Sequence, residues 1–194
     1  MRQNFYESTL EYLISQKHIL YNDKELYLYA FKVLIRSSIN ASVFFLMGLI
    51  LNMLQESILM FFSFFVLRKF AGGLHLKKYS TCFISSVVIN FLGLFLIKQL
   101  QEQPNYMFVV AVIASCLIIT IFAPIKQPNK YISKKEAWIY KFIAMIISGI
   151  ICLVSCGFVT SSSLEKIAYP LGIGLIISSA LVLLGKIYTY KTAR

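Results

Sequence analysis

The sequence predicts an all-α integral membrane protein with about six transmembrane helices, preceded by an N-terminal amphipathic helix. Hydrophobic residues make up 58% of the chain and charged residues only 14%, whereas soluble domains have about 45–50% and about 25%. The net charge is +11, but Lys and Arg gather in short clusters between apolar segments. Anionic lipid headgroups and membrane topology explain such clusters better than nucleic acid does. We therefore expect one membrane domain and no nucleic-acid partner.

Residues 1–36 are expected to lie at the membrane surface. Between residues 5 and 14, large apolar side chains fall roughly on one helical face and charged side chains lie elsewhere. This pattern is typical of an interfacial amphipathic helix. Asn22 and Asp23 interrupt the pattern, and the chain from Glu25 to Arg36 is expected to resume a helix that leads into the membrane.

Six apolar segments follow, and they define the predicted membrane domain, residues 37–185, with a tail at 186–194. A helix needs about 20 residues to cross the hydrocarbon core, and about 17 is the usual lower limit. The second segment is the doubtful one, because its uncharged core runs only from Ser57 to Leu67 and would also suit a re-entrant segment. The segments lie near 37–54, 57–71, 80–98, 106–123, 139–159 and 167–185.

The distribution of Lys and Arg predicts that all six segments cross the membrane. With a cytoplasmic N-terminus, the inner parts are 1–36, 68–79, 124–141 and the tail, which together hold seventeen of the nineteen Lys and Arg residues. If the second segment failed to cross, the division would be seven against twelve. Because short cytoplasmic loops carry the excess of Lys and Arg, we expect six spans with both termini in the cytoplasm.

The loop 68–82, RKFAGGLHLKKYSTC, is the candidate functional site. It contains a Gly72-Gly73 turn, one of only two histidines, His75, and a cysteine, Cys82. A Cys and a His in a polar loop between spans are a candidate nucleophile and base. Since the second segment is short, we expect this loop to be drawn into the inner membrane interface.

Cys82 is expected to lie at the start of a helix. Ser80 is a good N-cap residue, which would make Cys82 the second helical residue. The positive end of the helix dipole and the charges of Lys77 and Lys78 would then favour the thiolate, the nucleophilic form.

His75 precedes Cys82 by seven residues. On one unbroken helix this spacing separates the two by about 10.5 Å, whereas proton transfer requires about 3 Å. His75 can therefore act as a base only if the chain folds back, which Gly72-Gly73 would permit. The alternative is an ordinary interfacial histidine and a thiol that merely packs.

The other three cysteines, Cys116, Cys152 and Cys156, lie inside apolar segments. Buried cysteines usually pack as small hydrophobic residues. Cys152 and Cys156 are one helical turn apart, but the sequence shows no third His, Cys or Asp near them, so we predict neither a metal nor another cofactor.

Arg68, Ala71-Gly72-Gly73, His75 and Cys82 together resemble the signature of the AgrB (accessory gene regulator B) family. The polar linker from Ala123 to Glu136, with two prolines and several lysines, is similar to the second cytoplasmic loop of that family. The amphipathic start and the succession of spans agree, so the resemblance extends over most of the chain.

The resemblance implies a cysteine endopeptidase of quorum sensing in the bacterial cell membrane. Members of the family cut the C-terminal tail from a small AgrD-type propeptide, hold the new acyl end as a thioester, and let a substrate Cys or Ser close a ring. Cys82 would be the nucleophile and His75 the general base and then acid. Arg68, Gly72 and Gly73 would support the site or contact the substrate.

Two further roles stay open at this point. The lysines Lys77, Lys78, Lys126, Lys130, Lys134 and Lys135 could bind an acidic substrate tail, although topology alone already explains them. No acidic residue adjoins His75 in the sequence. Glu136 and Asn90 are candidates to orient it, and a dyad without a third member is the alternative.

A second function class is a small permease or peptide exporter without peptidase activity. Transporters mark their path with ionisable or helix-breaking residues near the midplane. Here the spans carry only the amides Asn40, Asn52 and Asn90, while Gly172 and Gly174 are the best sign of a broken helix. This thin support ranks the exporter behind the peptidase. A homodimer would suit a chain with so many apolar spans.

Overall fold

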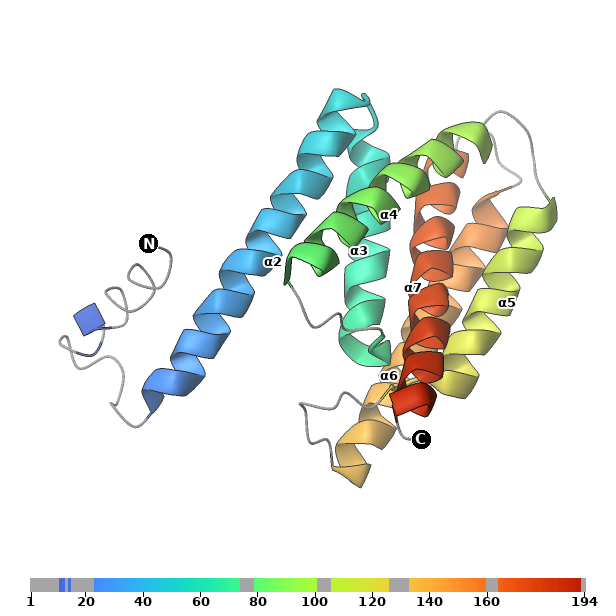
Figure 1. The fold of residues 1–194 in the computed structure, drawn as a ribbon. Helices are drawn as coiled ribbons and strands as arrows, with labels where there is room; N and C mark the ends of the chain where they lie inside the picture. Colours follow the sequence, from blue (N-terminus) through green and yellow to red (C-terminus); the bar gives the residue numbers. More distant parts are fainter. Residues whose placement is uncertain are drawn as a thin grey trace. The chain divides into compact units, whose positions relative to one another are not determined.

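The computed structural model describes residues 11, 12, 14, 23–73, 79–100, 106–125, 133–159 and 164–192, without the side chains of 79, 134 and 189–192. Within these residues every regular element is a helix (Figure 1), which confirms the predicted all-α class. The helices are α2 (Lys24–Ile50), α3 (Leu54–Ala71), α4 (Tyr79–Leu100), α5 (Tyr106–Phe122), α6 (Lys134–Phe158) and α7 (Glu165–Thr192).

Each of the six predicted apolar segments corresponds to one helix. By length and composition, α2, α4, α6 and α7 are long and apolar enough to cross a membrane. Helix α5 is equally apolar but has 17 residues. Helix α2 starts at Lys24, so it is the helix that was predicted to resume after Asp23. The predicted boundary at residue 36, between the surface segment and the membrane domain, lies inside α2. Most of the predicted amphipathic helix lies outside the described residues.

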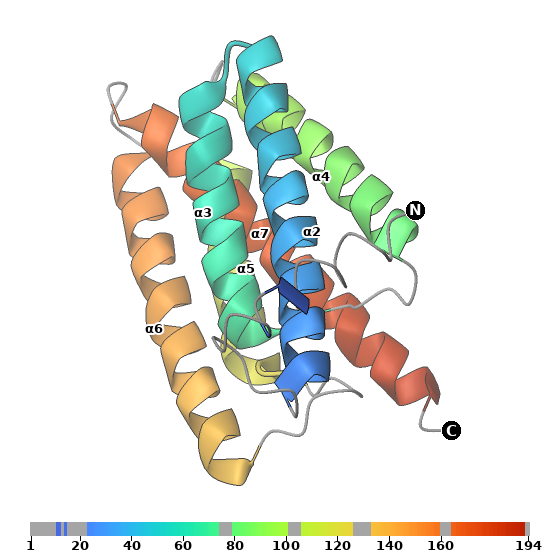
Figure 2. The same cartoon turned by 90° about the vertical axis from the view of Figure 1, so that its left-hand side faces the viewer.

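Helix α3 settles the form of the doubtful second segment. It is an unbroken helix of 18 residues, about 27 Å long at 1.5 Å per residue, and Figure 2 shows it running beside α6, which it contacts. It starts three residues before the prediction because the polar Gln55 and Glu56 form its first turn. It is not among the helices that are long and apolar enough to cross a membrane, so its crossing stays a prediction.

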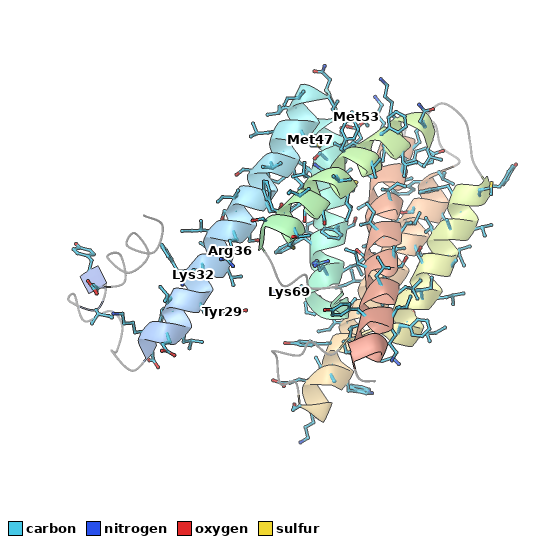
Figure 3. All side chains as sticks on the ribbon, in the orientation of Figure 1. Tyr29, Lys32, Arg36, Met47, Met53 and Lys69 are labelled. Atoms are coloured by element: carbon cyan, nitrogen blue, oxygen red, sulfur yellow. The ribbon has the colours of Figure 1, made fainter. Side chains whose placement is uncertain are left out.

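The chain divides into two compact units, residues 1–43 and 44–194, with the division inside α2. In the first unit, Tyr29, Lys32 and Arg36 lie on successive turns of one side of α2 (Figure 3). An ion pair of 3.6 Å joins Lys24 to Glu11.

Helix α7 is the centre of the second unit, because it contacts α3, α4, α5 and α6 (Figure 1). Glycines allow this close packing. A Cβ atom on Gly174 would overlap the Ser63 side chain of α3, and one on Gly172 would lie 2.9 Å from Cγ2 of Val112 on α5. Small residues at such contacts let helix backbones approach each other, which is how helices associate in membranes.

The outer surface of the second unit is apolar along whole helices. Such a surface is stable in lipid, whose tails are as apolar as the side chains themselves, so it supports the predicted membrane location. The large exposed side chains include Phe91, Leu92 and Phe95 on α4, Leu117 and Ile121 on α5, and Ile150 and Leu153 on α6.

Candidate functional site

Cys82 lines a cavity of about 180 Å³ within the second unit. Its polar lining consists of Arg68 from α3 and of Cys82, Ser85 and Ser86 from α4. The remaining walls are apolar and come from four helices: Phe44, Phe64, Ile89, Leu181 and Leu184. The cavity therefore combines a free thiol, one cation and an apolar surround, which is the make-up of a ligand site.

The start of α4 differs by two positions from the prediction. The helix begins at Tyr79, so Ser80 is its second residue rather than its N-cap, and Cys82 is the fourth residue rather than the second. Cys82 still lies in the first turn, where backbone N–H groups have no acceptor within the helix. These N–H groups can stabilise negative charge beside the sulfur.

Arg68 lies one turn before the end of α3, on the cavity wall. Its guanidinium packs over the Phe64 ring, with 5.7 Å between the guanidinium carbon and the ring centroid, within the range of a cation–π contact. Arg68 and Cys82 both line this cavity. The structure thus brings the predicted nucleophile and a predicted supporting residue into one cavity.

The Gly72-Gly73 turn ends α3 beside this cavity. The N–H of Gly72 donates to the carbonyl of Arg68 at 3.1 Å, and the two glycines have φ values of +76° and +145°. Such values are rare for residues with a side chain. Gly73 is buried, and a Cβ atom there would lie 3.6 Å from Nη1 of Arg68.

Several predicted site residues lie outside the described residues: His75, Lys77, Lys78, Lys126 and Lys130. The distance between the His75 imidazole and the Cys82 sulfur therefore stays a prediction, as does the binding of an acidic tail by the lysines. Lys135 is described, and its side chain is exposed at the start of α6.

The two candidates for orienting His75 have other contacts. Glu136 forms a capping box at the start of α6: its carboxylate accepts from the Ser133 N–H at 2.9 Å, and the Ser133 hydroxyl accepts from the Glu136 N–H at 3.2 Å. Asn90 is fully buried, and its amide nitrogen lies 3.5 Å from the Met47 sulfur. The capping box accounts for Glu136 structurally, whereas the buried side-chain oxygen of Asn90 has no hydrogen-bond partner among the described residues.

The sequence spacing showed no neighbour of Cys152 and Cys156 outside their own helix, and the structure adds one. Cys116 of α5 is an electrostatic neighbour of Cys152 on α6, as is Cys156. Sequence spacing could not show this, because it depends on the pairing of α5 with α6. In the part of the chain that the structure describes, no group of three or more His, Cys, Asp or Glu side chains is arranged to hold a metal ion.

Sequence reasoning also missed seven lining residues, among them Leu181, Leu184, Ser85 and Ser86. Leu181 and Leu184 lie in a uniformly apolar span, so nothing in the sequence marked them as site residues. Ser85 and Ser86 were weakly indicated by the sequence, because they form a polar pair one turn after Cys82. Their hydroxyls donate to the carbonyls of Thr81 at 2.8 Å and Cys82 at 2.9 Å, so their oxygens remain available as acceptors.

Comparisons with known proteins point to one family. The profile of the family described as Accessory gene regulator B matches residues 6–184. AgrB-like proteins of Clostridium perfringens, one from strain SM101 / Type A and one from strain 13 / Type A, are each 28% identical over 119 residues. The aligned part is 58% of this chain and 56% of each relative, so little more than half of their length is matched. No solved structure matches.

The family match and the helices suited to crossing a membrane support each other. The match extends over nearly the whole chain and includes all of α2 to α6 and most of α7. Membership also links the chain to the accessory gene regulator system. The chain is therefore a multi-pass membrane protein that belongs to the Accessory gene regulator B family.

Proposed function

We propose that this protein is a membrane cysteine endopeptidase that cleaves the C-terminal tail of a small AgrD-type propeptide and promotes its cyclisation. Family membership supports the system in which it works. The observation that carries the proposal is the shared cavity of Cys82 and Arg68, since it sets a thiol beside a fixed positive charge in an apolar surround.

In the first step, the Cys82 thiolate attacks the carbonyl carbon of the scissile peptide bond. The negative charge that develops on the carbonyl oxygen is stabilised by N–H groups in the first turn of α4 and by Arg68. As the carbon–nitrogen bond breaks, His75 gives a proton to the leaving amine. The tail leaves with a free amino group, and the rest of the propeptide stays bound to Cys82 as a thioester.

In the second step, a Cys or Ser side chain of the bound propeptide attacks the thioester carbonyl. Its proton passes to His75, the carbon–sulfur bond to Cys82 breaks, and a thiolactone or lactone forms. The reaction is intramolecular, which gives it a large advantage over hydrolysis. The apolar walls, among them Phe64 and Leu181, further limit access of water.

The proposal includes a location and a mode of substrate recognition. Both termini and the loop 68–82 face the cytoplasm, where the basic clusters meet the anionic inner leaflet. Lys77, Lys78 and the lysines of the 126–135 segment bind the acidic tail of the propeptide. A salt-sensitive KM that loses its salt dependence when these lysines are replaced in pairs, with topology unchanged, tests this part.

The exporter reading has no comparable support. The buried polar side chains among the described residues are seven serines, Asn90 and the phenol of Tyr169, with no Asp, Glu, Lys, Arg or His among them. Coupled transport normally requires an ionisable group at such depth. Helix α7 also runs unbroken through Pro170, Gly172 and Gly174, so the suspected break is not present.

The proposal is tested with purified protein in vesicles of anionic lipid and a candidate propeptide. Wild-type protein and the Cys156→Ala variant, which loses a thiol from a span, are expected to release the tail at similar rates. Cys82→Ala is expected to release none while keeping the thermal stability of the wild type. Tail release by Cys82→Ala at the rate of Cys156→Ala would refute the peptidase.

A further inference from the structure

The segment Ala123–Ile125, which follows α5, lies directly on the end of α3. The N–H of Ile125 donates to the carbonyl of Ala71 at 3.1 Å. Ala71, Ala123 and Ile125 are all buried, Ile125 with 7% of its surface exposed. The two parts of the chain that flank the predicted cytoplasmic loops are therefore joined by a backbone hydrogen bond between buried residues.

This contact depends on a glycine. A Cβ atom on Gly72 would lie 3.1 Å from the carbonyl oxygen and 3.4 Å from the nitrogen of Ile125, closer than most side chains approach a backbone. On the other side of the turn, a Cβ atom on Gly73 would lie 3.5 Å from Cβ of Leu181 on α7. The Gly72-Gly73 turn is thus held between the Ala123–Ile125 segment and α7.

The same turn lies against the candidate site. Gly73 adjoins the Arg68 guanidinium, and Arg68 lines the cavity with Cys82. A continuous series of contacts therefore runs from Ile125 through the glycine turn to Arg68, which lines the cavity together with the thiol. Packed contacts of this kind fix side-chain positions, because protein interiors hold few voids into which a side chain can shift.

We propose that Ile125 is a positioning residue for the Cys82 site. Its buried side chain and its N–H hold the Gly72-Gly73 turn against α7, and the turn keeps the Arg68 guanidinium beside Cys82. Lys126 follows directly, so the segment that carries the proposed tail-binding lysines starts from this anchor. For the peptidase proposed above, on which this role rests, Ile125 affects the rate of bond cleavage without touching the substrate.

The test compares Ile125→Ala with Ile151→Ala, which removes an equally buried isoleucine (8% exposed) from α6, away from the turn. Two quantities are measured: kcat and KM for tail release, and the rate of Cys82 alkylation by iodoacetamide between pH 6 and pH 9, read by peptide mass spectrometry. Ile125→Val, a smaller change, is measured in parallel.

Ile125→Ala is expected to lower kcat by about tenfold or more, since small displacements of catalytic groups have effects of this size, with KM within about twofold. Cys82 alkylation near pH 7 is expected to slow as well. Ile125→Val should keep most of the activity and Ile151→Ala all of it. Equal kcat and equal alkylation profiles for Ile125→Ala and Ile151→Ala would overturn the proposal.

Alkylation requires no propeptide, so it separates this proposal from the peptidase itself. If the wild-type protein cleaves no propeptide but Ile125→Ala still shifts the Cys82 alkylation profile, the peptidase is wrong and the positioning role stands. If cleavage proceeds normally and the profile does not move, the positioning role is wrong.

Discussion

Gly72→Ala is the substitution whose effect the structure defines most closely. Gly72 has φ +76° and ψ −149°, a combination that is nearly restricted to glycine and costs other residues about 1–3 kcal/mol. The added Cβ atom would also lie 3.1 Å from the Ile125 carbonyl oxygen, so the backbone of the neighbouring segment would have to move. Both effects disfavour the observed turn.

The magnitude follows from these costs. Since about 1.4 kcal/mol corresponds to a factor of ten, a cost of about 1–3 kcal/mol lowers the population of the native turn relative to its alternatives by about 5- to 150-fold. If Arg68 is placed beside Cys82 only in the native turn, kcat/KM for tail release is expected to fall by up to that factor.

The control for Gly72→Ala is Gly149→Ala in α6. A Cβ atom at Gly149 meets nothing within 4 Å, and alanine in a helix is favoured over glycine by about 1 kcal/mol. The assay is tail release in anionic vesicles, accompanied by thermal unfolding in detergent. Gly149→Ala should keep full activity. Activity of Gly72→Ala equal to that of the control would show that the turn does not position the site.

Arg68→Gln should slow both tail release and Cys82 alkylation at neutral pH, because it removes the positive charge beside the sulfur, while Arg68→Lys should restore part of both rates. Leu184→Trp is expected to fill part of the cavity and raise KM several-fold without lowering the thermal stability measured in detergent. Gly174→Leu should destabilise the protein by at least about 1–3 kcal/mol through overpacking against α3, visible as a lower thermal midpoint. Ser133→Ala should cost about 1 kcal/mol by removing the N-cap of α6, with tail release unchanged.

Much of the fold follows from sequence patterns that are local. Apolar segments of suitable length predicted six helices, and the second segment, whose form was doubtful, is an unbroken α3. The remaining errors lie at helix ends. Helix α3 begins at Leu54 and α4 at Tyr79, because polar residues such as Glu56 and Ser80 join the first helical turn where caps or loops were expected.

Only those site residues that lie close together in the sequence could be predicted from it. Cys82, Arg68 and the Gly72-Gly73 turn all lie in one loop and its flanks, and the structure groups them. Leu181 and Ile125 could not be found in this way, since they reach the site through the packing of α7 and of the segment after α5. Helix pairing leaves no local trace in the sequence of either partner.

The proximity of Cys116 to Cys152 has the same origin. Two helices that are both apolar throughout can pair in several rotational settings, and the side chains that meet depend on small residues at the interface. The spacing of Cys152 and Cys156 within α6 was visible in the sequence, whereas the proximity of Cys116 on α5 to Cys152 was not.

The identity of Cys82 as the nucleophile is tested most directly by trapping its acyl intermediate. Wild-type protein is mixed briefly with propeptide in vesicles, quenched in acid and digested for mass spectrometry. We predict an adduct on the peptide that contains Cys82, with the mass of the propeptide without its tail less one water, released by neutral hydroxylamine as expected for a thioester. Tail release without this adduct, or with the adduct on another residue, would contradict the role of Cys82.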